Sequence, residues 1–370
     1  MEASAIKLRT RNLRKTYGQV VAVDSADLDV REGEFLTLLG PSGSGKTTML
    51  MMVAGLTLPD GGDVWIDGKA ATYAPSFKRD IGMVFQNYAL FPHMTVYENI
   101  AFPLRMRRVA ETSIGEEVGR VLDLVQLPEV AQRLPSELSG GQQQRIALAR
   151  CMVYRPSIIL MDEPLGALDK KLRDQMQLEI KRLHTHLGIT VVYVTHDQEE
   201  AMIMSDRICL MNQASIEQIG APEELYFRPR TRFAASFLGE SNLLAADIVS
   251  NQGNLLLLRT VDGAMVRARV QGEDHHGGGS AFFMVRPESL SLLAPDEEAD
   301  NVIEGRLHDI IMVGGITKYY VETGGKAMLS ASALTSRSRR NLAPLERVRL
   351  GWSAEDTVVI EDGGTAKRPH

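Results

Sequence analysis

The segment Leu39-Gly-Pro-Ser-Gly-Ser-Gly-Lys-Thr-Thr48 contains three glycines, at positions 40, 43 and 45, and the last is followed by Lys46 and Thr47. A short apolar run precedes it and a helical pattern follows it, so a strand, a loop and a helix are expected in that order. In a P-loop of this spacing, backbone N–H groups surround phosphate oxygens, the lysine reaches the β- and γ-phosphates, and the Thr hydroxyl ligates Mg²⁺. The segment predicts a nucleotide-binding α/β domain with candidate ligands Gly40, Pro41, Ser42, Gly43, Ser44, Gly45, Lys46, Thr47 and Thr48.

A second apolar run, Ser157-Ile-Ile-Leu-Met-Asp162, ends in a carboxylate and is followed at once by Glu163. In open α/β sheets, ligands bind at the C-terminal ends of the strands. Asp162 is therefore placed to hold Mg²⁺ through water, and Glu163 to polarise a water that attacks phosphate. A strand-end acid followed by a helix-capping acid would give the same two residues, but beside a P-loop we favour the catalytic interpretation.

His196 follows the apolar run of residues 189–194 through Thr195, again at the C-terminal end of a predicted strand. It could hydrogen-bond a γ-phosphate or orient Glu163 and its water. A single histidine at such a position is more often a satisfied cap, so the catalytic interpretation needs a second observation.

The stretch Leu138-Ser-Gly-Gly-Gln-Gln-Gln-Arg145 contains a conflict at the start of a predicted helix. Ser139 and Gln142 have the spacing of a capping box. Gly140 and Gly141 lie inside the box, and each costs a helix about 1 kcal/mol relative to alanine. Either an anion approaches bare N–H groups at this helix start, or a flexible loop merely precedes the helix.

Composition indicates a globular protein of two or more domains, since 370 residues exceed one ordinary core. The net charge of −6 argues against a dedicated nucleic-acid binder. No apolar run approaches the ~18 residues that span a bilayer, and the N-terminal segment lacks the apolar stretch of a secretory signal. Cys151 and Cys209 lie in apolar sequence and are predicted to pack rather than react, so we expect a cytosolic, reducing compartment.

The pattern of the chain changes near residue 240. Residues 1–240 alternate apolar runs with helical patterns, which is typical of a parallel sheet, and residues 95–155 are predicted to form an inserted helical subdomain. Residues 241–370 are short alternating segments broken by glycine, which predict a small all-β barrel or sandwich. His275 and His276 are interpreted as part of a solvated loop. The turn at residues 211–215 lacks glycine, and we expect Asn212 to tolerate a left-handed backbone there while the strands persist.

Taken together, the motifs resemble those of the ATP-binding subunits of ABC transporters, in order along nearly all of residues 5–240. Gly40–Thr48 is similar to Walker A, Met161-Asp-Glu-Pro164 to Walker B with its catalytic glutamate, and Thr195-His-Asp197 to the switch histidine segment. Gly166 departs from the serine often found there, which we expect to loosen a subunit contact without abolishing hydrolysis. The other matches are the adenine-stacking Tyr17, the Q-loop Gln86, the signature residues Leu138, Ser139, Gly140, Gly141 and Gln142, and the D-loop Asp169.

The resemblance implies an α/β P-loop NTPase fold, with a RecA-like core and an inserted helical subdomain, followed by an all-β OB-like regulatory domain. It implies ATP and Mg²⁺ as ligands, with Thr47, Gln86 and Asp162 holding the metal in part through water. The chain has one set of motifs, so the family implies a homodimer, or a pair with a similar subunit, in which the signature binds the partner's ATP. Tyr88, Leu90 and Phe91 could be core residues, but we favour a groove that accepts a helix of a membrane subunit.

The β-rich tail resembles the regulatory domain of many prokaryotic importers. This implies a peripheral subunit at the cytoplasmic face of the inner membrane, with two integral-membrane permease subunits and an external solute-binding protein as partners. Phe237-Leu-Gly-Glu-Ser-Asn-Leu-Leu244 and Val285-Arg-Pro-Glu-Ser289 resemble the branch that imports spermidine and putrescine, and related branches serve ferric iron, phosphonates, thiosulfate or sugars.

Two other classes of protein are alternatives to an importer ATPase. A soluble ABC-type ATPase of DNA repair or translation predicts a coiled-coil insertion or two tandem ATPase modules, and the sequence has neither. A regulatory module without ATPase chemistry is disfavoured because the residues required for hydrolysis are intact, namely Lys46, Asp162, Glu163 and His196.

Overall fold

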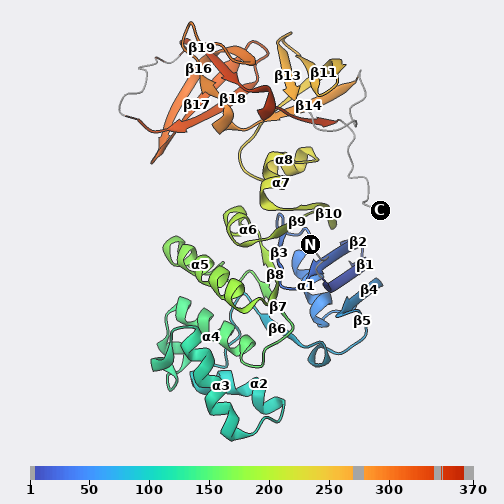
Figure 1. The fold of residues 1–370 in the computed structure, drawn as a ribbon, viewed down its shortest axis with the longest axis vertical. Coiled ribbons are helices and arrows are strands. Elements are labelled where there is room, and N and C mark those ends of the chain that lie inside the picture. The colour runs from blue at the N-terminus through green and yellow to red at the C-terminus, as the bar shows by residue number, and fades with distance from the viewer. Residues whose placement is uncertain (1–4, 270–278, 337–342, 344, 362–370) are drawn as a thin grey trace. The chain divides into compact units, whose positions relative to one another are not determined.

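The structure, a computed structural model, describes residues 5–269, 279–336, 343 and 345–361, in two compact units, Met1–Pro222 and Glu223–His370 (Figure 1). His275 and His276 lie outside the described residues. The domain boundary predicted near residue 240 stays a prediction. The two compact units meet between Pro222 and Glu223, which is earlier than that predicted boundary. The reason is that two short helices, α7 (Pro222–Phe227) and α8 (Arg232–Phe237), hydrogen-bond to Arg286 of the second unit through the carbonyls of Tyr226 and Ala235.

The first unit contains a six-stranded sheet with the strand order β10-β9-β3-β8-β7-β6. Neighbouring strands are parallel, except that β9 and β10 form an antiparallel hairpin. Both β3 and β8 are buried along their whole length, which explains why they are nearly continuous apolar runs. The predicted parallel sheet is confirmed. Its strands are β3 (Phe35–Leu39), β6 (Ile81–Val84), β7 (Ile158–Asp162), β8 (Thr190–Thr195), β9 (Arg207–Asn212) and β10 (Ser215–Gly220).

Three helices of the first unit begin directly after strands or loops of the predicted site. Helix α1 (Lys46–Ala54) follows β3 through the glycine-rich loop. Helix α5 (Lys170–Leu187) begins at Asp169, whose carboxylate accepts a hydrogen bond from the N–H of Leu172, 3.1 Å away. Helix α6 (Gln198–Met204) begins at Asp197, which caps it in the same way. These caps fix where each loop gives way to a helix.

The first unit also contains an antiparallel sheet with the strand order β2-β1-β4-β5, which the sequence pattern does not predict. It consists of β1 (Ile6–Tyr17), β2 (Val20–Arg31), β4 (Gly61–Ile66) and β5 (Lys69–Ala70). One face is buried in a core shared with α1 and with strands of the six-stranded sheet, where Leu8, Val30 and Val64 pack with Leu50. This sheet therefore covers one side of the nucleotide-binding loop and its helix.

The predicted helical subdomain is present between β6 and β7. It contains α2 (Val96–Met106), α3 (Glu111–Leu124) and α4 (Gly140–Met152). The predicted face of α3 is buried at Ile114, Val118, Val121 and Leu122. Among the described residues, no helix is long and apolar enough to cross a membrane.

The second unit is β-rich, as predicted, and holds two five-stranded antiparallel sheets with the orders β13-β12-β11-β14-β20 and β15-β19-β16-β17-β18. Both sheets contribute to one apolar core, in which Leu256 and Phe283 of the first join Leu307, Val321 and Leu350 of the second. The strands are β11 (Asn242–Gln252), β12 (Leu255–Thr260), β13 (Met265–Arg269), β14 (Ser280–Val285), β15 (Ser291–Leu292), β16 (Asn301–Val313), β17 (Ile316–Thr323), β18 (Met328–Leu334), β19 (Arg347–Trp352) and β20 (Val358–Glu361).

The glycine-free turn between β9 and β10 keeps both strands, as expected, but its left-handed residues are not Asn212. Gln213 and Ala214 have φ of 44° and 67°, while Asn212 pairs with Ser215 at the end of the ladder. A two-residue hairpin of this kind requires positive φ at both central positions. The carbonyl of Ala214 accepts a 2.7 Å hydrogen bond from the N–H of Asp24, which helps to hold the turn.

Candidate nucleotide site

The glycine-rich loop leaves no room for a side chain at Gly45. This residue precedes α1 with φ of 102°, and a Cβ there would lie 2.2 Å from the carbonyl oxygen of Ala22. Lys46 is buried, and its Nζ donates to the carbonyl oxygens of Gly40 at 2.8 Å and Pro41 at 2.9 Å. The loop therefore curls around its own lysine, which is the arrangement in which N–H groups can surround phosphate oxygens.

The electrostatics of Lys46 are set by burial and two carboxylates. Burial lowers the pKa of Lys46, while the negative charges of Glu163 and Asp162 raise it. A bound triphosphate adds further negative charge beside the ammonium group and favours its charged form. The residues are thus suited to an anionic ligand.

Thr47 and Asp162 lie together where Mg²⁺ is expected. The Thr47 hydroxyl donates to Oδ1 of Asp162 over 2.9 Å, joining the start of α1 to the end of β7. Burial raises the pKa of Asp162, and the hydrogen bond from Thr47 lowers it. A hydroxyl and a carboxylate are the oxygen ligands that Mg²⁺ takes in such sites, in company with phosphates and water. These residues fit the metal.

Glu163 and His196 are in contact, which supplies the second observation that the histidine required. His196 Nδ1 lies 3.1 Å from Oε2 of Glu163. Glu163 has an unfavourable backbone, with φ of 43°, and its N–H donates to the carbonyl of Val194 over 3.0 Å. A non-glycine residue in this region stores about 1–3 kcal/mol of strain, and such strain is concentrated at functional sites. We propose that Glu163 positions the attacking water and that His196 orients Glu163.

The residues proposed to contact adenine and to complete the metal site, Tyr17 and Gln86, are exposed where strands β1 and β6 end. Tyr17 ends β1 with 53% of its surface exposed, and the ammonium of Lys15 lies 5.5 Å from its ring centroid. Gln86 follows β6 and is exposed. A Cβ at Gly166 would lie 3.8 Å from Nε2 of Gln86, an ordinary van der Waals contact, so Gly166 lies beside this amide without being required by it. Their roles toward adenine and Mg²⁺ stay proposals.

The signature lies at the start of α4, and Figure 1 shows α4 in the helical subdomain, separated from α1. The predicted capping box is present: Ser139 N–H donates to Gln142 Oε1 at 2.9 Å, and Gln142 N–H to Ser139 Oγ at 3.4 Å. Gly140 is exposed at the helix start. The side chain of Leu138 is buried in the core that the subdomain shares with the six-stranded sheet.

The two glycines of the signature differ in their surroundings. Gly140 is exposed at the helix start, whereas Gly141 is buried. A Cβ at Gly141 would lie 2.9 Å from Cδ1 of Leu172 on α5. Close packing of α4 on α5 therefore gives Gly141 a second reason to lack a side chain. The role of Gly140 and Gly141 toward phosphate stays a proposal.

Of the three residues predicted to form the coupling groove, one is a core residue and two stay candidates. Tyr88 is only 7% exposed and belongs to the core that the helical subdomain shares with the six-stranded sheet, so the core alternative holds for it. Leu90 and Phe91 are half-buried and stay candidates for contact with a partner. Sequence reasoning missed Arg150, which donates to the carbonyls of Tyr88 at 2.9 Å and Ala89 at 2.8 Å and so holds their left-handed turn. A single basic residue on α4 gives no sequence signal for this contact.

The two cysteines pack, as predicted. Both are buried, and burial raises the pKa of Cys151 to about 11 and that of Cys209 to about 12. Thiols with such values stay protonated near neutral pH and are poor nucleophiles.

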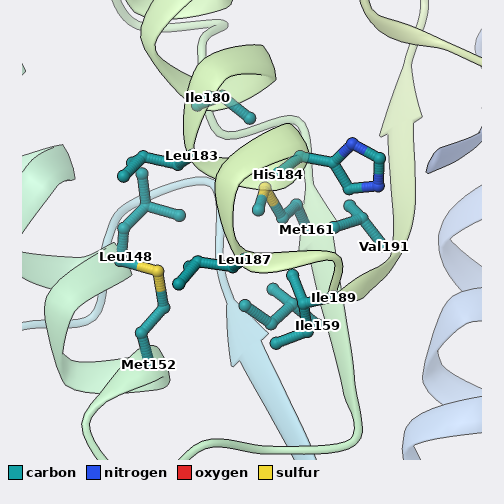
Figure 2. A pocket seen from close by; sticks show the side chains of 10 residues that line it. All are labelled: Leu148, Met152, Ile159, Met161, Ile180, Leu183, His184, Leu187, Ile189 and Val191. Atoms are coloured by element: carbon teal, nitrogen blue, oxygen red, sulfur yellow. The ribbon is translucent and has the colours of Figure 1, made fainter. Parts of the chain in front are cut away.

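A small pocket beneath α5 belongs to the packing of the unit. Its volume is about 20 Å³, room for about one water. Figure 2 shows the ring of His184 directed away from Leu148 and Leu187 on the opposite side of the pocket. His184 is buried, and its Nε2 lies 3.0 Å from the carbonyl oxygen of Gly33. The residues that line the pocket are Leu148, Met152, Ile159, Met161, Ile180, Leu183, His184, Leu187, Ile189 and Val191.

We expect the burial of His184 to make the stability of the protein depend on pH. Burial lowers its pKa in the folded state, and Nδ1 has no hydrogen-bond partner among the described residues. Below about pH 6.5, the ordinary pKa of histidine, the unfolded chain takes up a proton that the folded chain refuses. The free energy of unfolding should therefore fall as the pH is lowered through this value. Urea unfolding measures the free energy of unfolding at pH 5.5 and at pH 7.5. The difference between the two values should be smaller in His184→Leu than in the unaltered chain. It should be unchanged in His186→Leu, at an exposed position of the same helix. An unchanged difference in His184→Leu would contradict the assignment.

At the C-terminal ends of the adjacent strands β3, β8 and β7, the chain gathers the groups with which P-loop ATPases bind and hydrolyse a nucleoside triphosphate. The ABC transporter family profile matches residues 23–166, and the TOBE domain profile matches residues 283–360. The chain belongs to the family of ABC transporter ATP-binding subunits, because it also matches members of that family at 42–45% identity over more than 90% of its length. It is an ATPase coupled to transport, with ATP and Mg²⁺ as its ligands.

Individual relatives extend over both units. The spermidine/putrescine import ATP-binding protein PotA of Rubrobacter xylanophilus is 42% identical over 360 residues, which cover 97% of this chain and 95% of that protein. The protein of the same name from Thermobifida fusca is 45% identical over 361 residues, covering 94% and 91%. The solved dimeric structure of a bacterial ABC transporter cassette covers 58% of this chain and 98% of its own, with 35% identity and a TM-score of 0.53.

Proposed function

We propose that this chain is the ATP-hydrolysing subunit of a polyamine importer, in which it drives spermidine or putrescine through partner membrane subunits. The observation that carries the proposal is similarity along both units, at 42–45% identity, to proteins named for import of these two solutes. The matched span includes the TOBE region as well as the ATPase core. Two permease subunits and an external solute-binding protein would complete the assembly, with this chain peripheral at the cytoplasmic face of the inner membrane.

In the proposed reaction, each group acts on a defined atom. Lys46 and the loop N–H groups hold the β- and γ-phosphates. Thr47, Asp162 and Gln86 would hold Mg²⁺, in part through water, and the ion would supply positive charge beside the phosphate oxygens. Glu163 accepts a proton from water as the water oxygen attacks the γ-phosphorus, and the bond to the bridging oxygen of ADP breaks. His196 holds the Glu163 carboxylate in place. The products are ADP and inorganic phosphate.

We propose that the site is completed by a second copy of the chain. The signature helix α4 and the P-loop helix α1 lie in different parts of the first unit, so one chain supplies two half-sites rather than one site (Figure 1). The N-terminus of α4, with Ser139 and the exposed Gly140, is suited to the γ-phosphate held by a partner. A similar subunit in place of a second copy would satisfy the same geometry.

The solute is tested with the whole assembly in vesicles. ATP hydrolysis by the chain, its permease subunits and its binding protein should rise when spermidine or putrescine is added to the binding-protein side. The same assembly carrying Glu163→Gln controls for contaminating ATPases. Stimulation only by ferric iron, phosphonate, thiosulfate or a sugar would reject polyamine import and leave the importer ATPase standing.

The proposed coupling surface predicts that Leu90→Asp weakens capture of the membrane subunits. Leu90 is half-buried, and a buried carboxylate in an apolar contact costs several kcal/mol unless it is paired. Affinity purification of the permease subunits should then recover at least about tenfold less of this variant, since 1.4 kcal/mol is tenfold in affinity. Met106→Asp, at an exposed position of α2 in the same subdomain, should be captured as well as the unaltered chain. Equal recovery of both variants would count against the groove.

A further inference from the structure

Arg173, in the first turns of α5, connects two loops of the proposed catalytic site. Its Nη2 donates to the carbonyl oxygen of Leu168 over 2.9 Å, and its Nη1 donates to Oδ2 of Asp197 over 3.3 Å. Leu168 directly precedes Asp169 of the D-loop, and Asp197 directly follows His196. The guanidinium is half-buried, with 29% of the side chain exposed, as is the Asp197 side chain with 27%. A charge-assisted pair of this burial is less screened by solvent than a surface pair.

The backbone on both sides of His196 is held by further hydrogen bonds. The N–H of Asp197 donates to the Thr195 hydroxyl at 3.0 Å, and Oδ1 of Asp197 caps α6 by accepting from Glu199 at 2.8 Å and Glu200 at 3.2 Å. The position of Asp197 therefore fixes the start of α6 and the chain direction at His196. Arg173 binds the remaining oxygen of this carboxylate.

A buried carboxylate lies next to the same guanidinium. Glu200 is 3% exposed and accepts hydrogen bonds from the hydroxyls of Tyr193 and Thr195, each at 2.7 Å. Nε of Arg173 lies 3.9 Å from Oε1 of Glu200 and makes no hydrogen bond among the described residues. Charge compensation of Glu200 is thus a second, purely structural task that Arg173 could serve, and the experiment has to separate the two.

The start of α5 also contacts the signature helix. Leu172, the neighbour of Arg173, packs so closely on Gly141 that a Cβ there would be 2.9 Å away. One turn of α5 therefore makes three contacts. Leu172 contacts the signature helix, and Arg173 binds both Leu168 of the D-loop and Asp197 of the His196 loop. These are the segments that a closing dimer would press together in the proposed function.

We propose that Arg173 is a positioning residue that makes the D-loop and the His196 loop move as one body, so that docking of a partner on the D-loop sets the contact between His196 and Glu163. Arg173 itself touches neither water nor phosphate in this proposal. The proposal rests on the proposed roles of Glu163 and His196. Arg173 could pair with Glu200 alone. The proposal explains why its guanidinium instead binds the carbonyl of Leu168 and the carboxylate of Asp197, which lie on two different loops.

The test is a double-mutant cycle on the full chain, with ATP turnover and nucleotide affinity both measured. Arg173→Ala should lower kcat by about 10- to 100-fold, the range expected when a catalytic group is misplaced by about 1 Å, and leave KM nearly unchanged. Arg173→Lys, which keeps the charge near Glu200 but lacks the forked geometry, should recover only part of the loss. Lys181→Met removes a comparable tie from α5 to the carbonyl of Met204 and the carboxylate of Asp206, and should keep normal turnover.

The decisive readout is the effect of Arg173→Ala in a His196→Ala background. If Arg173 acts through His196, the loss on adding Arg173→Ala should nearly vanish there, while a structural defect would add to the first loss. Full recovery by Arg173→Lys, or additive losses, would overturn the proposal and leave charge compensation as the role. Near-normal turnover of His196→Ala alone would instead contradict the proposed function of the site, so the two failures are distinguishable.

Discussion

Replacement of Glu163 by glutamine should reduce ATP turnover at least about 100-fold, the lower end of what a positioned general base contributes. The amide keeps the volume of the side chain and an oxygen that can accept from His196, so the geometry of the pair survives. What is lost is the ability to accept a proton from water. ATP should therefore stay bound, and the ATP-bound dimer should persist for longer than in the unaltered chain.

Two measurements check this expectation. Phosphate release under saturating ATP reports turnover, and light scattering after gel filtration with ATP and Mg²⁺ reports the dimer. Glu199→Gln removes the same charge at an exposed residue of α6, only three positions from His196, and should leave both unchanged. A Glu163→Gln variant with near-normal turnover would remove Glu163 from the chemistry and leave the strained backbone at this residue without a functional reason.

The parts of the fold that could be predicted are those in which one physical requirement fixes many residues. Strands covered on both faces must be apolar throughout, so β3, β7 and β8 are evident as runs. The phosphate loop was also predictable, because N–H groups can surround an anion only where side chains are absent. Gly45 shows the constraint directly, since the carbonyl of Ala22 occupies the space of its Cβ.

The parts that were missed depend on contacts between segments distant in sequence. The antiparallel sheet of β1, β2 and β4 has bulges that shift the pairing, as between Thr10 and Leu13 of β1, and these interrupt the alternation by which a half-buried strand is recognised. Gly141 packs against Leu172, 31 residues later, and Arg173 binds Asp197, 24 residues later. Periodicity carries no information on such pairs.

Tyr88 illustrates the limit of inference from a resemblance. A run of Tyr, Ala, Leu and Phe fits a groove for a partner helix and fits a core equally well, because both need apolar surface. The backbone decides: positive φ at Tyr88 and Ala89, held by Arg150, turns Tyr88 inward and leaves Leu90 and Phe91 half-exposed. The same reasoning separates Gly140, which faces solvent, from Gly141, which faces α5.

Replacement of Ser139 by phenylalanine should block hydrolysis while sparing the binding of ATP to the isolated chain. Ser139 is exposed at the N-terminus of α4, where the proposed partner nucleotide approaches, and a ring there would hold the phosphate away from the helix. Loss of donors aimed at developing charge typically costs about 100- to 1,000-fold in turnover, and we expect a loss in this range. ATP affinity should be retained because the P-loop of the same chain is untouched.

The variant also removes a helix cap, so the control must remove one elsewhere. Thr95 begins α2 with the same kind of capping box, in which its hydroxyl accepts from Glu98 N–H at 3.2 Å, and it lies in the same subdomain. Thr95→Phe should lose about 1 kcal/mol of stability, as Ser139→Phe does, yet retain ATP-dependent dimerisation and turnover. Equal losses of turnover in the two variants would assign the effect to the cap. Normal dimerisation and turnover in Ser139→Phe would show instead that no phosphate is bound at this helix end, and the two-chain site would have to be abandoned.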